Sequence, residues 1–371
     1  MKKIAVFHQF LDNIGGAEIV TLILAREFNA EIYTTNINKD KIKKAGFEDV
    51  IPRIKSIGKV PVKAPFKHQF SLFRFSRLKL KDKYDYYIIS GDWAVSGAKH
   101  NKPNLWYVHS PCRELWDLKK FVRNSLLKEK WKKPVFDLWV LINRKIHKHY
   151  IKKVNEIVCN SKNTQKRLKE FLKTDAKIIN PPTETKEYYY KKPKNYWLSV
   201  NRLLKHKRIE MQLKAFEKMP NENLVIVGSY EKNANQFEEY KKEIDKLKPK
   251  NVEIKHWVSD KELKELYANS KGLICTAKDE DFGMTPVESM ASGKPVIASN
   301  EGGYKETIIG GKTGKLIEEI NPEKLSKELK KISKELKKNP SKYKKECQKR
   351  ARKFDIKNFI NKIKKRLFFP S

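Results

Sequence analysis

The chain has little cysteine, glycine or proline and no long hydrophobic run. Its four cysteines, Cys112, Cys159, Cys275 and Cys347, are scattered through 371 residues, and this spacing suggests neither a disulfide framework nor a zinc module. Fifteen glycines and 16 prolines are too few for a linker-rich or collagen-like chain. These absences favour a globular protein in a reducing, cytoplasmic setting.

Segments that direct a chain into or across a membrane are also missing. The apolar run at residues 4–7 ends at His8, short of the roughly 7–15 residues that a secretory signal needs. The window from Val135 to Ile142 contains Asp137 and is far below the ~20 residues of a bilayer span. We therefore expect no signal peptide and no transmembrane helix.

Acidic residues are scarce relative to basic ones. The chain carries 82 Lys and Arg against 44 Asp and Glu, a formal net charge of +38. This charge fits three interpretations, namely nucleic-acid binding, contact with an anionic membrane surface, or a lysine-rich composition without a partner. No nucleic-acid-binding motif is recognisable, so such binding would be weak, sequence-blind and steeply salt-dependent.

Two segments combine basic residues with large apolar ones. Residues 55–83 carry nine Lys and Arg against one acid, and residues 119–153 carry twelve against two. Their large apolar residues are Phe66, Phe70, Leu72, Phe73 and Phe75 in the first, and Phe121, Trp131, Phe136 and Trp139 in the second. This mixture is typical of an interfacial, lipid-facing surface. By contrast, residues 324–349 have the composition of a solvated helix face.

Short apolar runs alternate with helical periodicities over the first 180 residues. Residues 4–8 predict a strand, Gly15 and Gly16 a turn, residues 17–28 a helix and residues 31–35 a second strand. Further strands are expected at residues 84–90, 105–108, 156–160 and 177–179. Strands that alternate with helices indicate an α/β fold, with a parallel sheet covered on both faces.

A polar stretch bounded by prolines, residues 183–195, interrupts this pattern and predicts a linker. A second doubly wound series follows. Its strands are expected at residues 196–200, 224–227, 252–255, 272–275 and 295–298, and its helices at 208–218, 236–247, 260–269 and 286–291. We therefore predict a first domain over residues 1–182, the linker, a second domain over residues 196–355 and a C-terminal segment over residues 356–371.

The most specific stretch is DEDFGMTPVESMASGKPVIASNEGG, residues 279–303. It places Glu280 and Glu288 eight positions apart, on either side of the turn at Phe282. Carboxylates in this arrangement can accept hydrogen bonds from sugar hydroxyls.

The same stretch predicts the start of a helix in one of two ways. In the first, the backbone N–H groups of Gly283, Met284 and Thr285 open the helix toward an anion. In the second, Thr285 is the N-cap, Pro286 follows it, and Glu288 closes a capping box. The residues alone leave both interpretations open.

Two further pairs of residues lie where phosphates bind in α/β folds. Arg202 and Lys207 follow the first strand of the second domain, at the carboxyl edge of the expected parallel sheet. Gly15 and Gly16 precede the first helix, where missing side chains let a phosphate approach the helix N-terminus. The glycine pattern departs from G-x-G-x-x-G, which disfavours nicotinamide or flavin binding.

His109 follows a predicted strand of the first domain and precedes Pro111 by two positions. A lone histidine is commonly structural, but at a strand end it can donate a hydrogen bond to a reacting sugar or orient it. No group of His, Asp or Cys with metal-ligand spacing lies near it in the sequence, so a metal site is not expected.

Taken together, GGAE, YVHSP, NRLLKHK and the E-x7-E stretch resemble a family 4 glycosyltransferase of the GT-B fold. The resemblance spans almost the whole chain in the right order. Other runs, including HQFLDNIGGAE, YVHSPCRELWDL and CNSKNTQKRL, resemble the mannosyltransferase-like subgroup of O-antigen and exopolysaccharide assembly. The resemblance implies two Rossmann-like domains that face a central cleft, the first on the acceptor side, and a final helix, residues 356–369, that crosses back to the first domain.

The resemblance also assigns the donor diphosphate. Arg202 and Lys207 would hold it, with Gly16 and the amides after Phe282 nearby. The backbone around residues 256–260 would hold the nucleobase. Asn201 and Arg208 depart from the family pattern, in which glycines are usual at both positions.

For the sugar, the resemblance implies that Glu288 holds the ribose and Glu280 the hydroxyls of the transferred sugar. His109 would lie beside that sugar, and Glu18 would be a residue of the first helix.

The implied activity is metal-independent, retaining transfer of a hexose, with mannose from GDP-mannose favoured over UDP-sugars. Two fixed cations and helix dipoles can stabilise the departing diphosphate without a metal. The acceptor would be a lipid-linked or surface glycan, which places the protein peripherally on the inner face of the cell membrane. The alternatives are a nucleotide-sugar epimerase or phosphorylase of the same fold, or a charge-driven nucleic-acid-binding protein.

Overall fold

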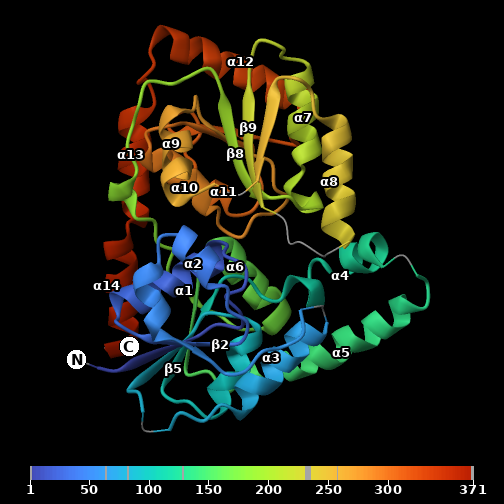
Figure 1. Cartoon of the computed structure of the whole chain (residues 1–371), viewed down its shortest axis with the longest axis vertical. Coiled ribbons are helices and arrows are strands. Elements are labelled where there is room, and N and C mark those ends of the chain that lie inside the picture. The colour runs from blue at the N-terminus through green and yellow to red at the C-terminus, as the bar shows by residue number, and fades with distance from the viewer. Residues whose placement is uncertain are drawn as a thin grey trace. The chain divides into compact units, whose positions relative to one another are not determined.

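The computed structural model describes residues 2–62, 65–81, 83–127, 129–229, 235–256 and 258–368. Positions 63, 64, 82 and 128 of the two basic segments, together with Trp257 and Phe369, lie outside these ranges. The chain divides into two units, the first made of Met1–Asn180 and Ile360–Ser371 and the second of Pro181–Phe359. Each unit contains one sheet flanked by helices (Figure 1), which confirms the predicted α/β class.

The first unit holds a seven-stranded sheet in the order β3-β2-β1-β4-β5-β6-β7, whose neighbouring strands pair in parallel. Its strands are β1 (Ile4–Phe7), β2 (Glu31–Thr34), β3 (Ile54–Ser56), β4 (Tyr86–Ile89), β5 (Asn104–Val108), β6 (Glu156–Cys159) and β7 (Lys177–Ile178). The sequence predicted every one of these except β3. That edge strand is three residues long and mostly exposed, so it carries no apolar pattern.

Among the described residues, six α-helices accompany this sheet in sequence before the linker. They are α1 (Gly16–Glu27), α2 (Lys39–Lys44), α3 (Phe66–Arg77), α4 (Lys119–Phe121), α5 (Lys132–Ile151) and α6 (Lys162–Arg167). A turn of 3-10 helix, η2 (Trp93–Lys99), lies between β4 and β5. All four residues of β1 are buried, as expected for a central strand covered on both faces.

The last helix, α14 (Ile356–Phe368), begins in the second unit and ends in the first. In the first unit, its Arg366 lies 3.4 Å from Glu156 at the start of β6. The ring of Phe368 packs edge-on against Tyr86 of β4, with centroids 5.7 Å apart. The end of the chain therefore contributes side chains to the first unit.

The second unit holds a six-stranded sheet in the order β10-β9-β8-β11-β12-β13, also parallel. Its strands are β8 (Trp197–Arg202), β9 (Leu224–Ser229), β10 (Val252–His256), β11 (Leu273–Cys275), β12 (Val296–Ser299) and β13 (Gly314–Ile317). The sequence did not predict β13, an edge strand that starts at a glycine.

The helices of the second unit follow the predicted alternation. They are α7 (Ile209–Glu217), α8 (Asn235–Leu247), α9 (Asp260–Asn269), α10 (Met284–Ala291), α11 (Tyr304–Thr307), α12 (Pro322–Lys338) and α13 (Lys344–Ala351). The lysine-rich region 324–349 forms α12 and α13. One face of α12 is buried through Leu325, Leu329, Ile332 and Leu336, so its lysines occupy the opposite, solvated face.

The predicted linker packs on the second unit. Lys294, which is 1% exposed, donates a hydrogen bond to the carbonyl of Lys191 at 2.7 Å, and Tyr190 donates to the carbonyl of Pro340 at 2.8 Å. At its start, Thr183 exchanges backbone hydrogen bonds with residues 354–356, so the two chain segments that connect the units lie side by side.

Two further expectations concern disulfides and membrane-spanning helices. The four cysteines are buried and form no disulfide. Within the described ranges, no helix combines the length and the apolar character needed to span a bilayer.

Candidate functional site

The predicted site residues of the second unit gather at the carboxyl ends of its strands. Strand β8 ends at Arg202 and leads into the 3-10 turn η7 (Lys205–Lys207). The loop after β11 carries Glu280. A hydrogen bond of 2.8 Å from the backbone N–H of Lys278 to the carbonyl of His206 joins the two loops. Ligands bind at this edge in parallel α/β sheets.

Lys207 and Glu280 form an ion pair. Lys207 Nζ lies 2.6 Å from Glu280 Oε2, and their side chains are 12% and 22% exposed. Thr276 Oγ1 donates to the backbone carbonyl of Lys207 at 2.7 Å, which fixes η7 against β11. The side chain of Arg202 is exposed and has no hydrogen bond or ion pair to any described residue. Of these two cations, Lys207 is therefore paired with a carboxylate and Arg202 is exposed to solvent.

Arg208 has the left-handed backbone that explains why glycine is usual at its position. Its φ is 54° and its ψ is 45°, a conformation that costs a residue with a Cβ about 1–2 kcal/mol. Its guanidinium pairs with Glu301 at 2.5 Å, and Glu301 also accepts from the N–H of Asp279 at 3.3 Å. Arg208 is thus a third cation at this edge, and no local pattern in the sequence indicates that Glu301 neutralises it.

Helix α10 starts at Met284, with Gly283 as its N-cap at φ 89°. The capping-box interpretation is therefore wrong, because Thr285 and Pro286 are the second and third helical residues and Glu288 lies beyond the first turn. The first-turn N–H groups of a helix have no acceptor within it. Those of Met284 and Thr285 therefore have no acceptor within α10, and the anion that the other interpretation places there stays a prediction.

Glu288 accepts a hydrogen bond from the hydroxyl of Tyr267 in α9, at 2.6 Å. Burial raises the pKa of Glu288 to about 6, an effect that the bond from Tyr267 opposes. Asp260 raises it further and Lys264 lowers it. The ionisation of this carboxyl group therefore changes just below neutral pH.

Two glycines hold the turn that carries Glu280. A Cβ on Gly302 would lie 2.3 Å from the carbonyl oxygen of Glu280, and one on Gly303 would lie 2.4 Å from the Cα of Phe282. The N–H of Gly303 donates to the carbonyl of Glu280 at 2.7 Å. The ring of Phe282 is buried against Phe354. Only the backbone of Phe282 can therefore contact a ligand.

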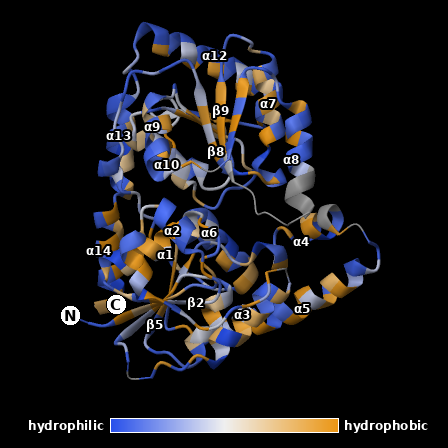
Figure 2. Ribbon diagram, viewed as in Figure 1, coloured by the Kyte–Doolittle hydropathy of each residue, from blue (hydrophilic) through white to orange (hydrophobic). Residues whose placement is uncertain are grey.

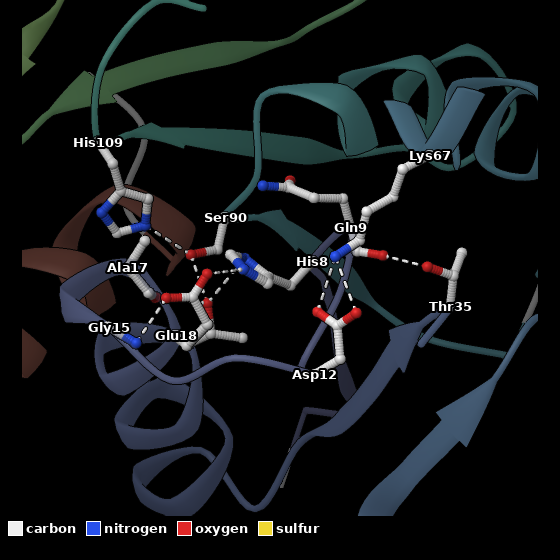
Figure 3. Close-up of polar contacts among 11 residues, drawn as sticks. His8, Gln9, Asp12, Gly15, Ala17, Glu18, Thr35, Lys67, Ser90 and His109 are labelled. Atoms are coloured by element: carbon white, nitrogen blue, oxygen red, sulfur yellow. Dashed lines mark hydrogen bonds and ion pairs between the residues drawn. The ribbon is translucent and has the colours of Figure 1, made fainter. Parts of the chain in front are cut away.

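In the first unit, His109 follows β5 and faces Ser90, which follows β4 (Figure 3). Ser90 Oγ lies 2.9 Å from His109 Nε2. The carbonyl of His109 accepts hydrogen bonds from Asn160 Nδ2 at 2.7 Å and from Thr164 Oγ1 at 3.3 Å. Both the backbone and the ring of His109 are thus held by neighbouring strand ends.

The glycine turn is occupied by a carboxylate of its own chain. Gly15 is the N-cap of α1 and donates its N–H to Glu18 Oε2 at 2.9 Å, while Gly16 begins the helix. The other oxygen of Glu18 lies 3.1 Å from Nε2 of the buried His8. Glu18 therefore caps α1, and an incoming phosphate would compete with it for the Gly15 amide.

Sequence reasoning missed three residues that connect these parts. Thr21 Oγ1 lies 3.1 Å from His8 Nδ1 and 2.8 Å from Ser90 Oγ. His8 and Ser90 directly follow strands, so a list of the residues at strand ends would have included them. Thr21 lies inside a helix and carries no such signal.

Two remaining expectations concern the base and a metal. His256 ends β10 and Ser259 caps α9, but Trp257, between them, lies outside the described residues. In the part of the chain that the structure describes, no group of three or more His, Cys, Asp or Glu side chains is arranged to hold a metal ion.

Several curated proteins of related sequence are mannosyltransferases. The chain is 29% identical to the alpha-1,3/1,6-mannosyltransferase ALG2 of Dictyostelium discoideum, over 58% of each chain. It is 30% identical to ALG2 of Saccharomyces cerevisiae, over 55% of this chain and 47% of the relative. The chain thus spans about half the length of these relatives. ALG2 of Kluyveromyces lactis matches over 83% of this chain and 71% of its own, at 25% identity.

Solved glycosyltransferase structures share the fold over the whole chain. HepE of Anabaena in complex with UDP and glucose has a TM-score of 0.77 at 17% identity and covers 99% of both chains. Sucrose-phosphate synthase of Thermosynechococcus elongatus has a TM-score of 0.74 at 17% identity, over 100% of both. The structural similarity establishes the GT-B fold, and at these low sequence identities it says nothing about substrates.

The family model described as "Glycosyl transferases group 1" matches residues 182–354, which is nearly all of the second unit. The match includes β8, η7 and α10, the elements that carry the cations and glutamates of the sheet edge. The second unit is therefore a glycosyltransferase group 1 domain, and the whole chain has the GT-B fold.

Proposed function

We propose that the protein transfers a hexose, with mannose the first choice, from a nucleoside diphosphate sugar to a lipid-linked glycan. The anomeric configuration is retained and no divalent metal is needed. The observation that carries the proposal is the carboxyl edge of the sheet of the second unit, where Arg202 ends β8, Lys207 follows in η7 and α10 starts after the β11 loop. The mannose preference rests on the activity named for the ALG2 relatives, and with it the choice of GDP-mannose.

The sheet edge suits a leaving diphosphate. Negative charge develops on the diphosphate as the bond to the sugar breaks, and fixed positive groups at that place lower the barrier. Arg202 and Lys207 supply two cations, and the first N–H groups of α10 supply the positive end of a helix dipole. These groups take the part that a divalent ion plays in metal-dependent transferases.

The carboxylates and the histidine have separate parts in this proposal. Glu288, held by Tyr267, accepts hydrogen bonds from the ribose. Glu280 accepts from hydroxyls of the transferred sugar, and His109 lies beside that sugar. Because Glu280 is already paired with Lys207, it is a poor nucleophile, and the leaving phosphate itself takes the proton of the acceptor.

An anionic membrane surface is part of the proposal, because α3 and α5 each carry a second apolar stripe that faces solvent. Both helices pack inward, through Leu72 and Val140 among others, and they contact each other through Gln69 and Asn143 at 2.8 Å. Their outward stripes are Phe66, Phe70 and Phe73 in α3, and Val135, Leu138 and Ile142 in α5 with Trp131 before it, all 44% to 67% exposed. Figure 2 shows apolar colour at intervals along both helices.

The charges around these stripes fit anionic lipid. Helix α3 contains no acidic residue, and the one acid of α5, Asp137, is paired with Lys119 and Arg123 at 2.8 Å each. An apolar stripe flanked by cations binds in the interface of an anionic bilayer. This surface supports a peripheral position on the inner face of the membrane, where a lipid-linked acceptor is reached.

The first prediction concerns the diphosphate cations. In transfer assays with GDP-mannose and a mannose-accepting lipid-linked oligosaccharide, Lys207→Ala should lower kcat/KM by roughly 10²–10³-fold, because it removes a charge that stabilises the leaving group. The control is Lys205→Ala in the same turn, whose side chain is 59% exposed and lies 3.6 Å from Glu243. Equal activity of both folded variants would contradict the proposal.

The second prediction concerns pH. Hydrogen bonds from a ribose diol to ionised Glu288 are charge-assisted and stronger than those to the neutral acid, and its pKa of about 6 means that it ionises as the pH rises through that value. The affinity for GDP-mannose should therefore rise roughly tenfold from pH 5 to pH 7 and then level off. Calorimetric titration measures this rise, and Glu288→Gln should bind weakly with no such rise. A pH-independent affinity of the unmodified protein would argue against the ribose role.

The third prediction concerns the membrane. Replacing Phe66, Phe70 and Phe73 with serine should strongly reduce sedimentation with vesicles of anionic phospholipid, because the apolar stripe of α3 is lost. Ile309→Ser, at an exposed apolar position of the second unit, is the control. Unchanged vesicle binding of the folded triple variant would show that the charge alone, or another surface, makes the contact.

A further inference from the structure

Arg208 and Asp279 both have a left-handed backbone, and both contact the carboxylate of Glu301. Their φ angles are 54° and 51°. Arg208 Nη2 lies 2.5 Å from Glu301 Oε2, and the same oxygen accepts the N–H of Asp279 at 3.3 Å. A left-handed backbone at a residue with a Cβ costs free energy, so it persists where neighbouring groups hold it, and such residues cluster at ligand sites. Two of them on one carboxylate indicate that this part of the edge is built to hold Arg208 in place.

The pair of Arg208 and Glu301 crosses the end of a central strand. Arg208 follows η7 after β8, whereas Glu301 follows β12, and β11 lies between β8 and β12 in the sheet. Thr276 directly follows β11 and is 0% exposed, and its Oγ1 lies 2.7 Å from the carbonyl of Lys207 and 3.2 Å from that of Arg208. The backbones of both cations are thus fixed to one side chain at the carboxyl edge, where ligands bind in parallel sheets.

Most hydrogen-bond donors of Arg208 are unused within the protein. A guanidinium carries five N–H groups, and in the described part of the chain only Nη2 of Arg208 donates to another residue, Glu301. Nε and Nη1 have no acceptor among the described residues. The Arg208 side chain is 18% exposed, so water reaches it only in part, and poorly solvated donors without an acceptor cost free energy. The unused donors therefore favour an acceptor from a ligand.

We propose that Arg208 is a third cation for the donor diphosphate, which it binds through Nε and Nη1 while Nη2 stays on Glu301. A planar guanidinium offers paired N–H groups that match two phosphate oxygens. This inference rests on the proposed function and extends its diphosphate site, for which the sequence named Arg202 and Lys207. Arg208 would also stabilise the charge of the leaving diphosphate, as those two cations do.

In this arrangement Glu301 is a positioning residue. It holds the guanidinium across the end of β11, so the side chain of Arg208 has little freedom left to lose when the diphosphate binds. The alternative is that the diphosphate displaces Glu301, in which case the carboxylate opposes binding. The two arrangements predict different effects of removing the charge of Glu301.

The test is calorimetric titration of GDP and UDP into the full chain, with a chelator present and salt near 0.15 M. Arg208→Gly should raise the Kd of the nucleotide that binds by roughly 10–100-fold, the usual effect of losing charge-assisted hydrogen bonds. The Kd of the matching nucleoside, guanosine or uridine, should change by less than about twofold, because it has no phosphate for these N–H groups to bind. Glycine adopts the left-handed backbone without strain, so this variant should fold.

Lys173→Gly is the matched control. Lys173 is an exposed lysine of the first unit whose φ is 53°, so the substitution removes a cation and a left-handed Cβ from the other unit of the chain. Its nucleotide Kd should equal that of the unmodified protein. The proposal would be overturned by a nucleotide Kd of Arg208→Gly equal to that of this control, or by a nucleoside Kd that weakens as much as the nucleotide Kd.

Two further variants separate the ways in which the diphosphate can bind. Arg208→Lys keeps the charge but offers an ammonium in place of the planar guanidinium, so its nucleotide Kd should stay at least about threefold above that of the unmodified protein. Glu301→Gln keeps an acceptor for Nη2, holds it less strongly and removes a charge that repels phosphate, so the Kd should change by less than about threefold.

Each of these variants has a result that would contradict the proposed arrangement. Full affinity in Arg208→Lys would contradict binding through two donor groups. A Kd lowered by about tenfold or more in Glu301→Gln would show that the diphosphate displaces the carboxylate.

Failure of the proposed function gives a different result. If the unmodified protein binds neither GDP nor UDP, the diphosphate site itself is absent and both proposals are wrong. If it binds one of them and Arg208→Gly binds that nucleotide equally well, only the part assigned to Arg208 is wrong.

Discussion

The placement of every candidate site residue depends on one constraint, the burial of two parallel sheets on both faces. A strand such as β1, with all four residues buried, has no room for a solvated polar side chain along its length. Polar groups that must meet a ligand can therefore stand only where strands end. In both units the charged and hydrogen-bonding side chains gather in the loops at the carboxyl edge.

At that edge, the net charge of +38 does not appear as a cluster of unpaired cations. Lys207 and Arg208 are each neutralised by a glutamate, Glu280 and Glu301. These carboxylates hold the cations in place, and a diphosphate would add to or replace them. In the first unit, Glu18 plays a similar part at the amide of Gly15. Two of the predicted anion contacts, Lys207 and the amide of Gly15, thus already have an internal carboxylate, whereas the side chain of Arg202 pairs with no described residue.

The sequence predicted the fold well where its signals are local. The strands in the sheet interiors are continuous apolar runs, so they were found within one or two residues, whereas the short edge strands β3 and β13 were not. Lys207 and Glu280 could be proposed because they follow strands in a recognisable motif. Their contact, like the Arg208 and Glu301 pair, links loops about 70 to 90 residues apart, and no local pattern reports such a pairing.

Other features could not be read from the sequence for identifiable physical reasons. The start of α10 was ambiguous because threonine followed by proline is a common cap, and the left-handed backbone of Gly283 decided the matter. The hydrogen bonds that connect Glu18, His8, Thr21 and Ser90 join the ends of β1 and β4 to α1, in part through hydroxyl groups. Serine and threonine are frequent in any chain, so a buried connection of this kind becomes visible only in three dimensions.

The central claim is that the carboxyl edge of the second unit binds a nucleoside diphosphate sugar without a metal ion. Calorimetric titration of GDP-mannose, UDP-glucose and UDP-N-acetylglucosamine, with a chelator present and salt near 0.15 M, tests it most directly. The account predicts saturable, one-to-one binding of one donor, GDP-mannose first, and its loss in Arg202→Ala. Binding of a short oligonucleotide but of none of the three donors would contradict it.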